Sequence, residues 1–82
     1  AHTMIHAIRI QTATGSHFSL RIRVGSNYAF ATWTLDDRVV ESRVLSIQGA
    51  REAWRKFQLV KRTQGKTNTF RQNFELTAPE KY

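Results

Sequence analysis

The residues of this chain that could do chemistry are mostly cations, concentrated in its second half. Between Arg51 and Arg71 there are seven of them, and Glu52 is the only acid. The seven are Arg51, Arg55, Lys56, Lys61, Arg62, Lys66 and Arg71. A second set lies in segments with strand-like patterns and consists of Arg9, Arg21, Arg23 and Arg43. Arginine outnumbers lysine nine to four, and its planar guanidinium makes bidentate contacts with phosphate or guanine.

The net charge agrees with this chemistry. The 82 residues carry a formal charge of +7, which is large for one small domain. Such an excess attracts nucleic acid first, and acidic proteins or anionic membrane surfaces after it. The alternative is that the charge serves solubility alone.

Catalytic and metal-binding patterns are weaker. No two ionisable residues have a recognised catalytic spacing, and His6 and His17, on neighbouring predicted strands, are too few for a metal site of three or four ligands. The chain has no cysteine, which excludes disulfides and fits a reducing compartment such as the cytoplasm. We therefore expect no catalytic residues, metal or cofactor. A small basic ribonuclease that uses a histidine and an arginine stays open as an alternative.

Aromatic residues could add base stacking to phosphate contacts. An aromatic ring among arginines on an open sheet face is the usual platform for single-stranded nucleic acid. Tyr28 or Trp33 could supply that ring, depending on which face of their strand points outward. For Trp33 a core position is the favoured alternative, and Trp54 and Phe57 are both interpreted as core residues.

Alternating apolar and polar residues predict four antiparallel strands, with turns at Gly15, at Gly25 and at Asp36-Asp37. The predicted strands span residues 4–13, 17–24, 28–35 and 38–47. In the second strand, the clearest of the four, Phe18, Leu20 and Ile22 point one way while Arg21 and Arg23 point the other. In the fourth, the adjacent pairs Val39-Val40 and Val44-Leu45 indicate a twist or a bulge.

The segment from Ser46 to Gly65 predicts an amphipathic helix. Its apolar residues recur at helical spacing and are Ala50, Ala53, Trp54, Phe57 and Val60. We expect Ser46 to cap the start of the helix and Gly65 to end it. The apolar stripe should cover the sheet face built from Phe18, Leu20 and Ile22. Two basic surfaces would then compete as the binding site: the outer face of the helix and the open face of the sheet.

The segment FRQNFEL from Phe70 predicts a short last strand, with Phe70, Phe74 and Leu76 inward. The fold class expected is therefore α+β: a small antiparallel sheet of four strands, one amphipathic helix packed on one face, and a short C-terminal strand. We expect a single domain over residues 4–78. Residues 1–3 look like a tag remnant, and residues 79–82 should form a frayed tail.

At the level of pattern, strands followed by RVLSIQGAREAWRKF resemble the three-stranded-sheet-plus-helix DNA-binding modules of phage integrases and plant AP2 proteins. That resemblance implies major-groove reading by the sheet face opposite the helix. The order of strands before a helix is also similar to PC4-like single-strand-binding domains. No functional residue is carried over from either.

These observations predict a small basic, non-enzymatic nucleic-acid-binding protein, with DNA slightly favoured over RNA. The alternative is a small phage- or plasmid-type interaction or inhibitor protein that docks on an acidic protein surface. Membrane binding is not expected, because the apolar stripe of the helix is needed to cover the sheet. An unpaired strand edge is a template for pairing, so a homodimer through such an edge is a further expectation.

Overall fold

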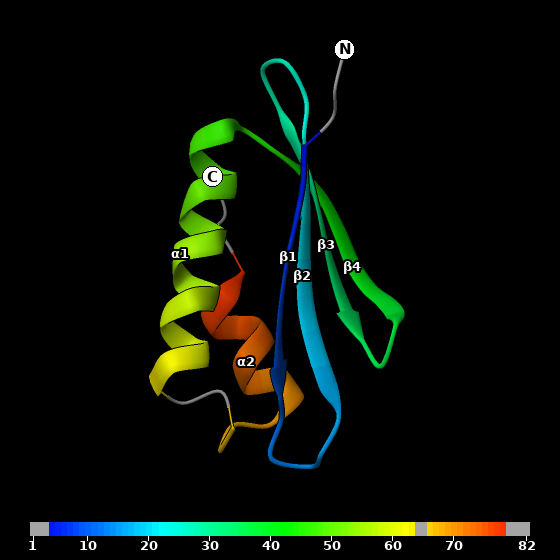
Figure 1. Ribbon diagram of the computed structural model, residues 1–82, viewed down its shortest axis with the longest axis vertical. Coiled ribbons are helices and arrows are strands. Elements are labelled where there is room, and N and C mark those ends of the chain that lie inside the picture. Colours follow the sequence, from blue (N-terminus) through cyan, green and yellow to red (C-terminus); the bar gives the residue numbers. More distant parts are fainter. Residues whose placement is uncertain (1–3, 64–65, 79–82) are drawn as a thin grey trace.

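A computed structural model describes residues 4–63 and 66–78 of the chain. Four strands form one antiparallel sheet in the order β1-β2-β3-β4, in which each strand pairs with the next. The strands are β1 (Met4–Gln11), β2 (His17–Val24), β3 (Ala29–Leu35) and β4 (Arg38–Leu45). Two helices, α1 (Ile47–Thr63) and α2 (Phe70–Thr77), cover one face of the sheet (Figure 1). The predicted α+β class, the four-stranded sheet and the first helix are confirmed.

The hairpin turns follow from the residues at their tips. Asp36 and Asp37 have φ angles of 50° and 68°, as the central pair of a two-residue hairpin turn requires. The Asp36 carboxylate accepts a hydrogen bond from the backbone N–H of His17 at 2.9 Å. That bond, with a second from the Ser16 side chain, holds the pKa of Asp36 below its ordinary value.

A β-bulge interrupts the pairing of β3 with β4. Trp33 pairs with Glu41 but Thr34 pairs with Val39, so Val40 is the extra residue. The bulge predicted from the adjacent valines is confirmed at this pair.

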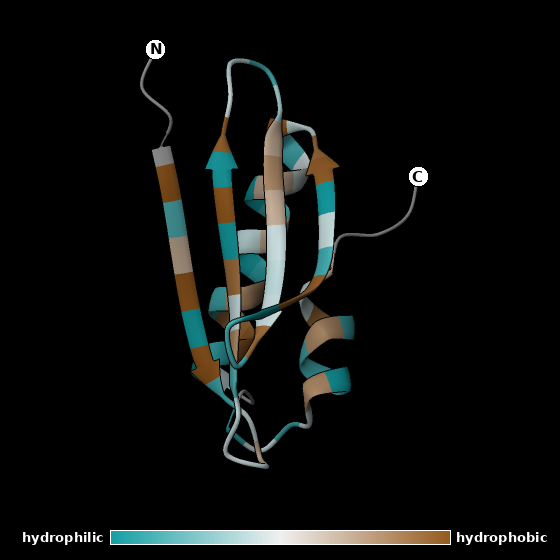
Figure 2. Ribbon diagram, turned by 90° about the vertical axis from the view of Figure 1, so that its right-hand side faces the viewer, coloured by the Kyte–Doolittle hydropathy of each residue, from teal (hydrophilic) through white to brown (hydrophobic). Residues whose placement is uncertain are grey.

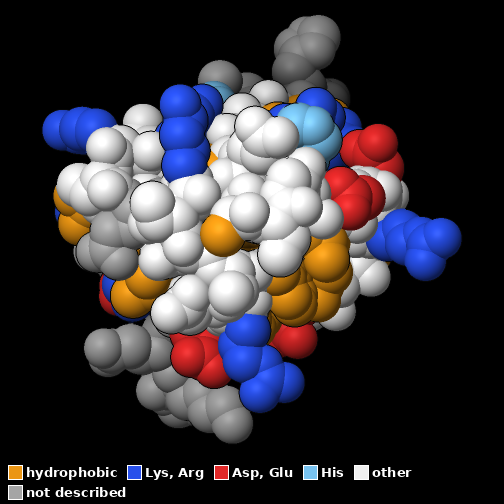
Figure 3. Space-filling model, turned by 90° about the horizontal axis from the view of Figure 1, so that it is seen from below, with side chains coloured by type: hydrophobic (Ala, Val, Ile, Leu, Met, Phe, Trp, Pro, Cys, Tyr) orange, Lys and Arg blue, Asp and Glu red, His pale blue; other side chains and the backbone are white. Residues whose placement is uncertain are grey.

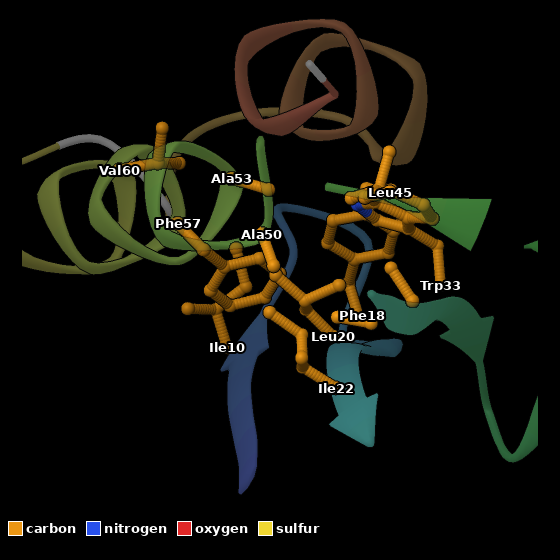
Figure 4. Packing of buried hydrophobic residues seen from close by; sticks show 12 residues of the cluster. Ile10, Phe18, Leu20, Ile22, Trp33, Leu45, Ala50, Ala53, Phe57 and Val60 are labelled. Atoms are coloured by element: carbon orange, nitrogen blue, oxygen red, sulfur yellow. The ribbon is translucent and has the colours of Figure 1, made fainter. Parts of the chain in front are cut away.

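The core lies between the sheet and α1. Phe18, Leu20 and Ile22 of β2 are buried beneath the helix, and the rings of Phe18 and Phe57 stack at 5.4 Å between centroids. Figure 4 shows the side chains of the sheet and of α1 pointing toward one another. Ala50, Ala53, Phe57 and Val60 supply the buried face of α1. The predicted packing of this stripe on β2 is confirmed.

The predicted C-terminal strand is wrong, because the segment forms α2. Thr69 caps this helix: its hydroxyl accepts from the backbone N–H of Gln72 at 3.3 Å, and the Gln72 side chain accepts from the backbone N–H of Thr69 at 2.9 Å. Asn73 and Thr77 are buried, whereas Leu76, predicted to be inward, is 44% exposed. The partly buried Phe70 and Phe74 share the face of Asn73 and Thr77 at helical spacing.

The start of α1 agrees with the prediction. The Ser46 hydroxyl accepts from the backbone N–H of Gly49 at 3.0 Å, as an N-cap does. The predicted helix end at Gly65, the tag remnant at residues 1–3 and the frayed tail at residues 79–82 lie outside the described residues.

The face of the sheet opposite the helices is open. Figure 2 looks onto it and shows hydrophilic and hydrophobic residues alternating along the strands. On β2 this alternation places Arg21 and Arg23 on the open face and Phe18, Leu20 and Ile22 toward the helices. The open face also carries the exposed apolar residues Ile5 and Val44. Within the described residues, no helix is both long and apolar enough to cross a membrane.

Candidate nucleic-acid interface

Two hollows lie between one flank of α1 and the edge strand β1. The first, ≈ 270 Å³, is bordered by His6 on β1 and by Arg51, Trp54 and Arg55 on α1. The second, ≈ 560 Å³, is bordered by residues from the end of β1 and the second half of α1, and by Lys66 in the loop after α1. Figure 1 shows that α1 and β1 run in the same direction. The two hollows therefore follow one another along these elements.

Cations line both hollows, and no Asp or Glu among the described residues does so. We call this lining the basic seam, and its cations are Arg9, Arg51, Arg55, Lys61, Arg62 and Lys66. All six side chains belong to exposed residues.

Helical geometry explains why the seam is basic. Positions 51, 55, 58 and 62 differ by four, three and four residues, so their side chains share one flank of α1. From Arg51 to Arg62 this flank extends about 16 Å at 1.5 Å per residue. The opposite flank carries Glu52, whose carboxylate pairs with Lys56 Nζ at 3.3 Å. The acid of α1 is therefore turned away from the seam, and Lys56 with it.

The open sheet face is a second, less charged surface. Arg21 and Arg23 of β2 are exposed there, and the Arg23 guanidinium lies 5.7 Å from the centroid of the Phe30 ring. Arg9 at the edge lies 3.9 Å from the carboxylate of Asp37. A hollow of ≈ 380 Å³ on this face is bordered by Arg9, Arg21 and Asp37. The open face thus combines three cations with an acid.

The end of the molecule at which the β1–β2 and β3–β4 turns lie carries both signs of charge. Figure 3 looks onto this end and shows Lys and Arg side chains around its margin, with Asp and Glu side chains between them. The turn end therefore offers no surface of one sign.

Two further predicted cations lie away from the seam. Arg43 is on the helix-covered side of β4, where its guanidinium lies 5.9 Å from the centroid of the Trp33 ring and pairs with Glu41 at 2.5 Å. Arg71 is exposed on α2 and borders neither hollow. Of the eleven cations named from the sequence, the structure brings six together along the seam: Arg9, Arg51, Arg55, Lys61, Arg62 and Lys66.

The two predicted stacking aromatics differ in exposure. Trp33 has no exposed surface, and its ring meets that of Phe74 edge to face at 5.8 Å, which agrees with the core alternative. Tyr28 is 50% exposed. Its ring lies so close over Gly25 that a Cβ there would be 2.9 Å from a ring carbon. Of the two, Tyr28 alone has ring surface that a base could reach.

Sequence reasoning missed Trp54 and His6 as residues of this site. Trp54 is only partly buried, and its ring meets the His6 ring at 5.8 Å in an edge-to-face contact beside the first hollow. His6 itself is exposed. The available signal was position: Trp54 lies at the margin of the apolar stripe, on the side of Arg51.

His6 and His17 lie far apart on the sheet. His6 pairs with Ile22 on β2, five residues from His17, which corresponds to about 17 Å along the strand. Within the described ranges, no three His, Cys, Asp or Glu side chains are grouped as a metal site needs.

Comparisons with protein-family models, with curated proteins and with solved structures find no match for this chain. The four-stranded sheet and the second helix also differ from the three-stranded modules that the sequence pattern resembles.

Proposed function

We propose that this chain is a small basic, non-enzymatic nucleic-acid-binding protein that contacts phosphates through the basic seam. The observation that carries the proposal is the lining of the two hollows, which contains six exposed cations and no acid from the described residues. The open sheet face, with Arg21 and Arg23, is the secondary contact surface.

The dimensions of the seam support phosphate contact. The cationic flank of α1 is about 16 Å long, and one strand of a nucleic-acid helix carries one phosphate per about 3.4 Å of helix axis. About five phosphates of one strand therefore lie within this axial length, which matches the five cations that α1 and the following loop contribute. Each neutralised phosphate releases counterions, so binding should weaken steeply as salt rises.

The second candidate is a small interaction protein that docks the same seam on an acidic protein surface. The observation in its favour is that β1 is an edge strand whose outer side has no strand partner among the described residues. An extended acidic segment could pair with that edge while its carboxylates meet the cations of α1.

Fluorescence anisotropy with single- and double-stranded DNA and RNA, each at 50 and 200 mM salt, tests the first candidate. We expect binding at the lower salt and a large loss at the higher one. Absence of binding to all four at the lower salt would reject it. A pull-down whose captured protein survives nuclease treatment would then support the second candidate.

A further inference from the structure

The first hollow differs in chemistry from the rest of the basic seam. Its lining combines apolar residues, among them Ile22, Val24 and Ala50, with one aromatic ring and two arginines. The second hollow has two isoleucines but no aromatic ring, and two glutamines and four cations complete its lining. At the side of the first hollow stands Trp54, a large ring that the core covers only in part. The cations Arg51 and Arg55 lie on the same flank of α1.

An apolar hollow beside an aromatic ring and two guanidinium groups fits a planar group attached to a phosphate. The volume of the hollow, ≈ 270 Å³, is slightly below the range of about 300–1,000 Å³ that is typical of ligand pockets. The hollow therefore suits one small ring system rather than a larger ligand. A nucleobase has that shape and a π face for Trp54, while its phosphates would lie toward the arginines.

We infer that the first hollow receives one unstacked nucleobase against Trp54, and that the seam therefore takes single-stranded nucleic acid. This inference rests on the proposed function. In a duplex the bases are stacked and paired, and bringing one into the hollow would require flipping it out at additional cost. A single strand presents its bases without that cost.

Tryptophan fluorescence with a (dT)12 oligonucleotide tests this. Trp33 is fully buried, so a change on binding reports Trp54. We expect quenching in the native protein and in Leu59→Ala, a control at an exposed position that borders neither hollow. Trp54→Phe should remove the quenching but keep most of the affinity, because it retains an aromatic face. Trp54→Leu, which keeps an apolar side chain without that face, should bind about tenfold more weakly.

The outcomes separate this inference from the proposed function. Binding of duplex as tightly as of single strand, no quenching in the native protein, or equal affinity of Trp54→Leu would each overturn the base site and leave phosphate binding standing. Failure to bind any nucleic acid would reject both. Circular dichroism of each variant establishes that it is folded.

A different observation concerns β4, whose outer edge has no strand beside it among the described residues. Residues 40–44 read Val-Glu-Ser-Arg-Val, which is self-complementary about Ser42. If a second copy of β4 lies antiparallel with the two Ser42 residues opposite, Glu41 meets Arg43 of the other copy at two places, so the ion pair within each chain is exchanged for one between the chains. Val44 then lies beside Val40, the extra residue of the bulge, at two places. Opposite-charge and apolar cross-strand pairs stabilise such pairing. Val40 and Val44 are 42% and 64% exposed and so available.

The geometry points to a homodimer through β4, with a second copy of this chain as the partner. The pairing would extend the sheet to eight strands and leave both basic seams free at its outer edges. Seven strand spacings of about 4.8 Å separate the two β1 strands by roughly 34 Å.

Size-exclusion chromatography with light scattering tests the dimer. We expect twice the 9.5 kDa chain mass. Glu41→Arg places like charges opposite one another and should give monomers, while the charge swap Glu41→Arg with Arg43→Glu restores the pairs and the dimer. Val44→Lys, at an exposed position, should also give monomers. A native monomer at millimolar concentration, or dimers that persist in both Glu41→Arg and Val44→Lys, would overturn the inference.

Discussion

Neutralising the seam should flatten the salt dependence of binding. With five phosphates contacted on a single strand, log affinity should fall with log salt at a slope of about −3.5. Raising salt from 50 to 200 mM would then weaken binding about 100-fold. The triple variant Arg51→Gln, Arg55→Gln, Arg62→Gln leaves two contacts, a slope of about −1.4 and a loss of only about sevenfold. Anisotropy titrations of one labelled oligonucleotide over this range measure the slopes.

A control triple separates the seam from net charge. Lys56→Gln, Arg38→Gln and Arg71→Gln also lower the formal charge from +7 to +4, at positions that border neither hollow. The control should keep a slope near that of the native protein. Equal slopes for the two triples would refute the reasoning, because binding would then follow net charge. A flattened slope in Arg21→Gln, Arg23→Gln with a native slope in the seam triple would place the phosphates on the open sheet face.

Three further predictions concern stability. Thr69→Ala removes the capping hydroxyl of α2 and should lower the free energy of unfolding by about 1 kcal/mol in urea titrations. Asp36→Asn should lower the melting temperature at neutral pH. Because the pKa of Asp36 in the folded state is depressed below 3.8, the carboxylate contributes to stability above that pH, and the contribution is lost as pH falls through the depressed value. In strong acid the melting curves of the native protein and the variant should therefore converge. Asp37→Gly relieves a left-handed φ of 68° and should raise the free energy of unfolding by about 0.5–1 kcal/mol in urea, since the exposed ion pair with Arg9 that it removes is worth little.

Long periodic segments made most of the fold predictable. The alternation of β2 is long enough to exclude a helical repeat of three to four residues, and the apolar stripe of α1 is long enough to exclude the two-residue repeat of a strand. Both predicted elements were confirmed. FRQNFEL is too short for that, because a spacing of four between Phe70 and Phe74 fits a strand as well as a helix. The deciding signal was the capping pair Thr69 and Gln72, which lies at the border of the segment and was overlooked.

The site was less predictable than the fold. That α1 has a basic flank follows from its sequence, but which sheet edge the flank meets depends on how the helix lies across the strands. The alternation of β3 left Trp33 undecided, and its pairing with Leu20 places it on the helix-covered side. Trp54 lies at the edge of the apolar stripe of α1. The sequence does not show how far around the helix the sheet covers that stripe, so the exposure of Trp54 could not be predicted.

The exposure of the basic seam follows from the places of the two helices on the sheet. The two helices share one sheet face, but α2 has only eight residues and packs toward the end where β2 begins, with Phe70 against Phe18. In Figure 1 the start of α1 lies beside the strands without α2 next to it. α2 packs on the β3 side of α1, where the ring of Phe74 meets that of Trp33, and Figure 2 shows α2 and β1 on opposite sides of the sheet. The β1 side of α1 therefore has no helix beside it among the described residues, and Trp54 and His6 meet there. Because α2 covers the other flank, both the first hollow and the cations of α1 stay exposed toward β1.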